Sequence, residues 1–265
     1  MYYEHQYFLD DDLKIIHHID RFKKGSGFLA HIQYNLEILL MRKGSAEISI
    51  DDQTIIVKEN ELCIIPPNRI HKGFTHSECC EYHCLIIDHS LYDNWFKAAE
   101  QKFPLKCTDQ AIVNACKSVF NLLEQKPRYY KQEINAHIIL MFANLFRLGN
   151  EQSVTDGSAS DNHRIDMTRA AIIYMYKNFT SDISIDDIAN AAGFSKYYFC
   201  RCFKEITGQT PLNYLNYIRL KSAKALLKSG SSNITETALK CGFNNASYFC
   251  KLYKKYFGKS PKQDM

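Results

Sequence analysis

Two sets of polar and basic side chains recur near the end of the chain, each interleaved with aromatic residues. In the first set, the guanidinium of Arg201 could form a bidentate pair with a guanine, and in the second the hydroxyl of Ser247 could bond several bases. The ammonium groups of Lys204 and Lys254 suit phosphate oxygens. These residue types predict contacts to duplex DNA. The candidate contacts are Lys196, Tyr197, Cys200, Arg201, Lys204, Ala246, Ser247, Cys250, Lys251 and Lys254.

The two sets belong to a repeated segment of the sequence. Gly208 and Pro211 return 50 residues later as Gly258 and Pro261, and in both copies a Gly-Phe pair precedes the aromatic and basic residues. A repeat of two short helices joined at a glycine is typical of tandem helix-turn-helix units. The alternative is a helical bundle in which the repeated aromatics only form a core.

Each copy carries the signals that begin and end a first helix. Ser184 with Asp187 three residues later, and Asn233 with Glu236, predict N-caps with capping-box acids. Apolar residues then recur at helical spacing until a glycine ends the helix. We therefore expect the same short helix in both copies.

The second helix of each copy is expected to begin after Ser195 or Asn245 and to turn its aromatic residues inward. This orientation leaves the polar face for the major groove. Between the copies, Leu212 to Lys228 alternates apolar residues with basic ones, Arg219 among them. The alternation predicts a long connecting helix with one basic face, which would fix the spacing of the two units.

Residues from about 166 to 263 resemble the DNA-binding domain of the AraC/XylS family of bacterial transcription regulators. The resemblance rests on the pattern Ile-x-x-x-Ala-x-x-x-Gly-Phe, followed by Tyr-Phe-x-Lys-x-Tyr-Lys-Lys-x-Phe-Gly-x-x-Pro, in the second copy. It implies that helices starting near Lys196 and Ala246 enter two successive major-groove segments on one face of the DNA. The second copy has Lys251 and Tyr253 where the family commonly shows Arg and Phe. Because lysine lacks the bidentate fork of arginine, we expect the second unit to read sequence more weakly.

Charge is sorted along the chain in the same way. Residues 164–265 contain 16 Lys and Arg against 7 Asp and Glu, a net charge of +9, whereas the rest of the chain carries −5. A soluble surface does not need its two signs separated by domain. The basic part is therefore the expected DNA-binding part, and its affinity should fall as salt rises.

Composition predicts a cytoplasmic globular protein. The apolar share is 46% and the mean hydropathy −0.32, no apolar run is long enough to span a bilayer, and the first residues lack the order of a secretion signal. The 10 cysteines show no paired zinc-ligand spacing. We expect them to be reduced thiols, with a redox sensor built from Cys200 and Cys250 as a lesser alternative.

The chain divides into four predicted segments, which make an α+β multidomain protein. Residues 1–90 hold short β-rich segments separated by turn signals, typical of a small β-barrel or jelly roll. Residues 91–148 hold two helical patterns and a possible homodimer seam, 149–163 have a linker composition, and 164–265 carry the tandem helix-turn-helix units. The aromatic residues from Tyr2 to Phe8 suggest a movable arm over the barrel.

Residues from about 10 to 90 resemble the cupin-like sensor domain that many AraC-family members carry. The matching pieces are His31-x-Gln33-x-x-x-Glu37, then Gly44, and Pro66-Pro67-Asn68-Arg69-Ile70-His71. The resemblance implies a small-molecule effector inside the barrel, bound by His31, Gln33, Glu37 and His71. Metal-binding cupins use two His, one Glu and a further His, and here Gln33 stands at one of those positions. We therefore expect no metal or other cofactor.

The preferred interpretation is a sequence-specific transcription regulator that is not an enzyme and responds to a small effector. Its expected partners are a promoter with two adjacent major-groove elements per monomer, a second copy of the chain and RNA polymerase, but no membrane. One alternative is a metal-dependent cupin enzyme fused to a nucleic-acid-binding domain, with imidazole and carboxylate ligands that suit iron, manganese or zinc. Another is an RNA-binding or architectural protein, which would show no preference for paired DNA elements.

Overall fold

The structure is a computed structural model that describes residues 13–33, 35–88, 90–92, 103–151, 159–228 and 232–265. The chain forms two compact units, which divide between Ile165 and Asp166. The arm predicted at Tyr2 to Phe8 lies outside the described residues.

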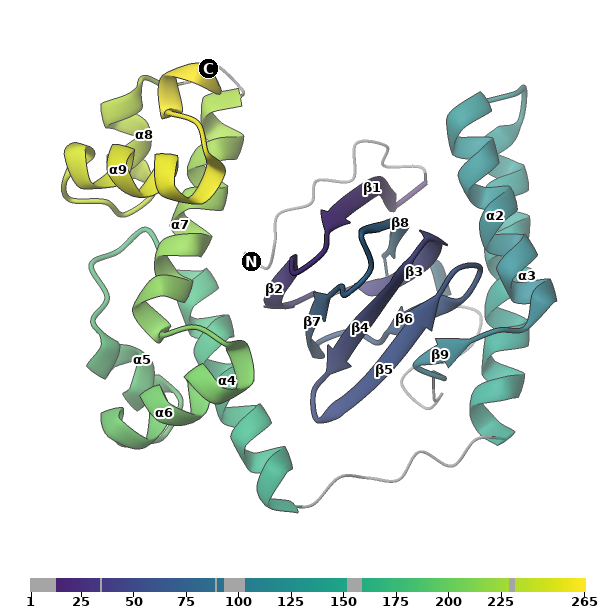
Figure 1. Ribbon diagram of the computed structural model, residues 1–265, viewed down its shortest axis with the longest axis horizontal. Helices are drawn as coiled ribbons and strands as arrows, with labels where there is room; N and C mark the ends of the chain where they lie inside the picture. The colour runs from purple at the N-terminus through teal and green to yellow at the C-terminus, as the bar shows by residue number, and fades with distance from the viewer. Residues whose placement is uncertain (1–12, 34, 89, 93–102, 152–158, 229–231) are drawn as a thin grey trace. The chain divides into compact units, whose positions relative to one another are not determined.

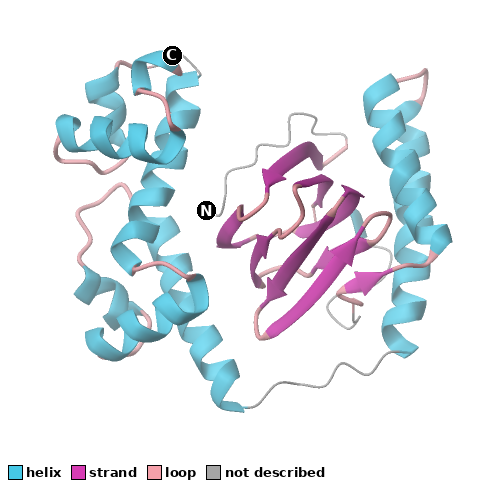
Figure 2. Ribbon diagram, in the orientation of Figure 1, coloured by secondary structure: helices cyan, strands magenta, loops and turns pink. Residues whose placement is uncertain are grey.

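The N-terminal unit contains two antiparallel sheets, drawn as arrows in Figures 1 and 2. The five-stranded sheet has the order β1-β8-β3-β6-β9 and the four-stranded sheet the order β2-β7-β4-β5. The strands are β1 (Ile15–Lys23), β2 (Gly27–Ile32), β3 (Leu36–Lys43), β4 (Ser45–Ile50), β5 (Gln53–Lys58), β6 (Leu62–Ile65), β7 (Ile70–Phe74), β8 (Cys79–Ile87) and β9 (Lys106–Cys107). This arrangement confirms the predicted cupin-like β-architecture.

The five-stranded sheet is covered on both faces. Along β3, Leu36, Ile38 and Leu40 pack in one core with the helices α2 (Gln110–Gln125) and α3 (Tyr130–Glu151), whereas Leu39 and Met41 pack in a second core with the four-stranded sheet. Successive strand residues point to opposite faces, so a nearly continuous apolar strand serves two layers. Helices α2 and α3 lie beside this sheet in Figure 2.

Two boundaries differ from those that the sequence predicts. Strand β9 pairs Lys106 and Cys107 with β6, inside the segment 91–148 that was expected to be helical. Helix α3 continues to Glu151, and α4 (Ala159–Asn178) begins at Ala159, so helices occupy both ends of the predicted linker 149–163. A two-residue strand is too short to show any period in the sequence.

The C-terminal unit is helical. It contains most of α4, followed by α5 (Ile185–Ala191), α6 (Lys196–Thr207), α7 (Pro211–Lys228), α8 (Ile234–Lys240), α9 (Ala246–Phe257) and a 3-10 turn, η2 (Pro261–Gln263). Pairs α5–α6 and α8–α9 form the two predicted helix-turn-helix units, and they lie beside opposite ends of α7 in Figure 1. Among the described residues, no helix is long and apolar enough to cross a membrane.

The helix starts follow the predicted capping residues. Ser184 and Asn233 each form a complete capping box, with Asp187 and Glu236 respectively. Ser195 is the N-cap of α6 but its side chain makes no capping hydrogen bond, whereas Asn245 accepts one from the backbone of Tyr248. The turns need a left-handed residue after the first helix of each unit, and Gly193 and Gly242 supply it with φ of +83° and +81°.

One feature of α7 contradicts the predicted basic face. Lys221 and Lys228 are exposed, but Arg219 is only 8% exposed and lies among the buried residues of the helix. Its guanidinium donates to backbone carbonyls instead of facing solvent. The alternation of basic and apolar residues could not distinguish an arginine that serves a tertiary contact from one that serves the surface.

Candidate functional site

The first unit presents a polar face on α6. Lys196, Tyr197, Arg201 and Lys204 are exposed, and Cys200 is half-buried among them. Three residues of the opposite face are buried, namely Phe199, Cys202 and Phe203. This pattern is that of an amphipathic helix anchored by its aromatics, with the predicted contact residues available to a groove.

Helix α9 repeats this arrangement in the second unit. Ser247, Lys251 and Lys254 are exposed, Ala246 and Cys250 are half-buried, and the aromatic anchors Phe249 and Tyr253 are completely buried. Tyr248, an exposed aromatic residue on this helix, is not among the predicted contacts. It lies three residues before Lys251, and so on the same side of the helix.

Neighbouring side chains orient two of the basic groups on α6. The ammonium of Lys196 lies 2.7 Å from a carboxylate oxygen of Asp186 on α5, and this hydrogen bond raises the pKa of Lys196. The guanidinium of Arg201 lies 5.7 Å from the ring centroid of Tyr198, within cation–π range. Arg201 is therefore held above a surface aromatic, while Lys196 would have to exchange a carboxylate for a phosphate.

The surroundings of Cys200 do not favour its thiolate form. Burial raises its pKa, although the charge of Lys196 opposes this shift. A reactive cysteine needs a lowered pKa, because the thiolate is the nucleophile. The alternative of a redox sensor at Cys200 and Cys250 thus gains no support from the α6 side.

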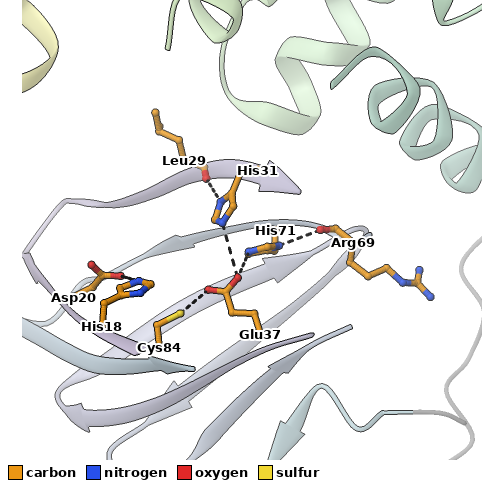
Figure 3. Close-up of polar contacts among 8 residues, drawn as sticks. All are labelled: His18, Asp20, Leu29, His31, Glu37, Arg69, His71 and Cys84. Carbon is orange, nitrogen blue, oxygen red and sulfur yellow. Dashed lines mark hydrogen bonds and ion pairs between the residues drawn. The ribbon is translucent and has the colours of Figure 1, made fainter. Parts of the chain in front are cut away.

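In the N-terminal unit, four residues from four strands converge inside the sandwich (Figure 3). His31 on β2, Glu37 on β3 and His71 on β7 come together as the sequence predicts, and Cys84 on β8 joins them. The Oε2 atom of Glu37 lies 3.0 Å from Nε2 of His71 and 4.0 Å from Nε2 of His31. Its Oε1 atom accepts a bond from Sγ of Cys84 at 3.2 Å.

Backbone carbonyls fix the orientation of both imidazoles. Nδ1 of His31 donates to the carbonyl of Leu29 at 2.9 Å, and Nδ1 of His71 donates to that of Arg69 at 3.0 Å. Each ring therefore turns its Nε2 atom toward the carboxylate of Glu37, as Figure 3 shows.

The carboxylate of Glu37 remains charged although it is buried. Burial alone would raise its pKa, but the charge and hydrogen bond of His71 outweigh this effect and lower the pKa of Glu37 to about 2. A charged His71 can donate through both ring nitrogens, to Arg69 and to Glu37. The cluster is a network of buried polar groups that borders the apolar core between the two sheets.

The ligand atoms of His31, Glu37 and His71 lie within 4.8 Å of one another, close enough to hold a metal ion. Ligands about 2.0–2.2 Å from a metal lie roughly 3–3.5 Å apart, so the three side chains would have to approach one another slightly. Their Nδ1 bonds to carbonyls are the type that orients histidine ligands.

Two further residues bear on the predicted effector set, namely Gln33, which belongs to it, and Cys84, which it did not include. Gln33 follows β2 and is 3% exposed, and its backbone carbonyl accepts a bond from Asn68. Cys84 was not predicted, but the strand alternation that places Cys80, Tyr82 and Ile86 in the inner core also places Cys84 there. That alternation was the signal available in the sequence.

A separate hollow of about 350 Å³ lies between the outer face of the five-stranded sheet and α2. It is lined by Leu40, Met41, Arg42, Asn60, His83, Lys117, Phe120, Asn121 and Glu124. At its wall, Arg42 donates to Nε2 of His83 at 2.7 Å, and His83 donates from Nδ1 to Nε2 of His17 at 2.9 Å. None of the predicted effector residues lines this hollow.

Comparisons with known proteins match the N-terminal and the C-terminal part of the chain to two different domain families. Residues 19–142 match the AraC-like ligand binding domain, and residues 188–264 match a helix-turn-helix domain. The uncharacterized HTH-type transcriptional regulator YdeC of Bacillus subtilis is 25% identical over 251 residues, which cover 87% of this chain and 84% of the relative. The HTH-type transcriptional activator RhaS of Escherichia fergusonii is 22% identical over 236 residues, which cover 86% and 84%.

The fold also resembles that of a solved structure. Wild-type ToxT of Vibrio cholerae, in complex with unsaturated fatty acid, aligns with a TM-score of 0.52 over 94% of each chain at 15% identity. Two antiparallel sheets with helices, followed by tandem helix-turn-helix units, thus recur as one architecture. With a ligand-binding domain and a helix-turn-helix domain that both match, the chain belongs to the AraC family of transcription regulators.

Proposed function

We propose that α6 and α9 read two adjacent major-groove elements of one promoter. The observation that carries this proposal is the pair of helices with buried aromatics and an exposed polar face, one in each unit. The expected base contact is Arg201, which extends its guanidinium beside Tyr198, while the lysines of both helices suit phosphates.

Selection of bound duplexes from random sequence by the full chain tests this reading. We expect the selected duplexes to share two conserved elements about one helical turn apart. A single conserved element, or no consensus, would contradict reading by both helices. A preference for structured RNA in the same assay would favour the RNA-binding alternative.

We further propose that the cluster of His31, Glu37, His71 and Cys84 is the effector site, and that the buried Gln33 also contacts the effector. An ionised carboxylate and two oriented imidazoles suit a small polar molecule such as a sugar, whose hydroxyl groups both donate and accept. An effector would have to replace the Glu37–His71 bond, and that exchange couples its binding to the packing of four strands. The relative ToxT was solved with a fatty acid, so effectors of structural relatives need not be polar.

Calorimetric titration with a panel of sugars and other metabolites tests the site. Binding by the wild type that is lost in Glu37→Gln, but kept when Glu124 of the separate hollow is changed to Gln, would support it. The reverse pattern would move the effector to the hollow lined by Arg42 and His83.

A second candidate occupant is a divalent metal ion, because the three ligand atoms converge within 4.8 Å. Imidazole and carboxylate ligands suit iron, manganese or zinc. Metal analysis of protein purified without chelators decides between the two occupants. Stoichiometric metal that disappears in His71→Gln would establish a metal site, and only such a site would leave room for the metal-dependent enzyme. Its absence would leave the regulator without enzymatic activity, as we propose.

We propose a homodimer through α3. Most apolar residues of this helix pack on the sheet, but Ile139 is 38% and Leu140 58% exposed. Sedimentation equilibrium should give a dimer for the wild type and a monomer for Leu140→Glu. A dimeric variant would contradict this seam.

The regulator is expected to act in the cytoplasm, where it meets the promoter and RNA polymerase.

A further inference from the structure

A buried arginine links the connecting helix α7 to the loop that leads into the first unit. Arg219 donates from Nε to the carbonyl of Phe179 at 2.8 Å and from Nη2 to the carbonyl of Ser181 at 2.8 Å. Both carbonyls lie between the end of α4 and the start of α5. Because Arg219 is only 8% exposed, it is positioned for this contact and not for DNA.

The same guanidinium contacts the turn of the second unit. A Cβ atom added to Gly242 would overlap the carbonyl oxygen of Phe179 and would lie 2.9 Å from Nε of Arg219. The guanidinium carbon also lies 5.9 Å from the ring centroid of Phe243. One carbonyl and one side chain therefore meet both the entrance of the first unit and the turn of the second.

The equivalent glycine of the first unit lacks such a neighbour. Gly193 has nearly the same φ as Gly242, but a Cβ atom there would meet nothing within 4 Å. The two glycines hold the same place in the repeat and the same backbone conformation. Only the second is also a contact between the units.

We propose that Arg219 is a positioning residue that sets the two recognition helices in a fixed relation, so that α6 and α9 engage their elements together. Its planar fork bonds two carbonyls at once, which fixes the loop before α5 to α7 in both direction and distance. The carbonyl of Phe179 in this loop then packs closely against Gly242 in the turn between α8 and α9. Specificity for the spacing of the two DNA elements follows from this contact. The inference rests on the proposed reading of two elements.

The test compares three duplexes: the selected one, one with a single element scrambled, and one with about five base pairs inserted between the elements, which is half a helical turn. The variant is Arg219→Lys, which keeps the charge but cannot form both bonds. We expect its affinity for the intact duplex to fall about tenfold to hundredfold, and its affinity for the single-element duplex by at most about threefold. Its discrimination against the inserted duplex should fall by a similar factor.

One surface control and one pair of glycine variants separate positioning from folding. Lys221→Met removes an exposed charge from the same helix and should leave spacing discrimination unchanged. Gly242→Ala should reduce spacing discrimination more than Gly193→Ala, because both strain the backbone but only the first crowds Arg219. Circular dichroism and thermal unfolding identify variants that lose structure, and Arg219→Met serves as a second substitution if Arg219→Lys is one of them.

The outcomes are distinct. Equal losses on all three duplexes, or unchanged spacing discrimination in Arg219→Lys and Arg219→Met, would overturn the positioning role. If the wild type itself binds the single-element duplex as tightly as the intact one, the proposed reading of two elements fails instead. A loss confined to the intact duplex supports both.

Discussion

At the scale of single residues, the structure separates groups that face a ligand from groups that hold the protein together. Arg201 and Arg219 are both arginines of the C-terminal unit, yet the first is exposed beside Tyr198 and the second bonds two carbonyls. Sequence reasoning placed both on polar faces. Burial by a neighbouring segment decides the difference, and only tertiary structure contains it.

The first prediction concerns the two kinds of DNA contact. Arg201→Ala should cost about 1–3 kcal/mol of binding free energy on the preferred duplex and relax the choice at one base position. Lys254→Ala should weaken preferred and random duplexes alike, because a phosphate contact carries no sequence information. Fluorescence anisotropy on both duplexes measures the losses. A uniform loss for Arg201→Ala would assign it to the phosphates.

A second prediction follows from the histidine pair in the N-terminal unit. Burial, followed by the charges of His17 and Arg42, lowers the pKa of His83 from 6.5 to about 4. As pH falls through this window the unfolded chain binds a proton that the folded chain does not, so the free energy of unfolding should decrease. Above 6.5 this contribution is constant, since His83 is neutral in both states.

Urea unfolding of the wild type and of His83→Gln across that window measures the effect. The variant should lose stability less steeply with acidification, although not fully, because burial also lowers the pKa of His17. Equal slopes in the two proteins would show that His83 does not carry the dependence.

At the scale of elements, helices whose signals lie within a few residues were predicted better than strands that depend on pairing with distant segments. The helix-turn-helix units could be predicted from the capping boxes at Ser184 and Asn233 and from the glycines that follow each first helix. These features depend only on neighbours within a few residues. Strand β9 escaped prediction because it exists only through pairing with β6. In the candidate site, His31, Glu37 and His71 were found through a family pattern, whereas Cys84 required knowledge of which face of β8 is inner.

The third prediction uses the unequal caps of α5 and α6. Ser184→Ala removes a side chain that caps Asp187, and should lower the free energy of unfolding by about 1 kcal/mol. Ser195→Ala should cost clearly less, since the side chain of Ser195 makes no capping bond. Chemical denaturation of the two variants provides the comparison, and equal losses would mean that Ser195 caps α6 in solution.

At the scale of the whole molecule, charge and function are divided between the two units in the same way. Basic residues outnumber acidic ones in the helical unit, whereas acidic residues outnumber basic ones in the remainder. The net positive charge of the helical unit favours its attraction to DNA phosphates, whereas the net negative charge of the remainder does not.

The fourth prediction is the salt dependence that this division implies. The logarithm of the binding constant should fall linearly with that of the salt concentration, with a slope near −0.9 for each phosphate neutralised. Lys254→Met should reduce the slope by about 0.9, whereas Lys117→Met, in the N-terminal unit, should leave it unchanged. A flat response in the wild type would contradict the groove model.

Strand β3 buries both of its faces, so that the residues of each face can change independently of the other. Its odd-numbered positions Glu37, Leu39 and Met41 face the four-stranded sheet, and its even-numbered positions Leu36, Ile38 and Leu40 pack with helices α2 and α3. Substitutions on the inner face of β3 can change the polar groups around Glu37 without changing the residues that pack on α2 and α3. With the effector site proposed at Glu37, a change of effector specificity would require substitutions on the inner face of β3 only, and the packing of α2 and α3 would be kept.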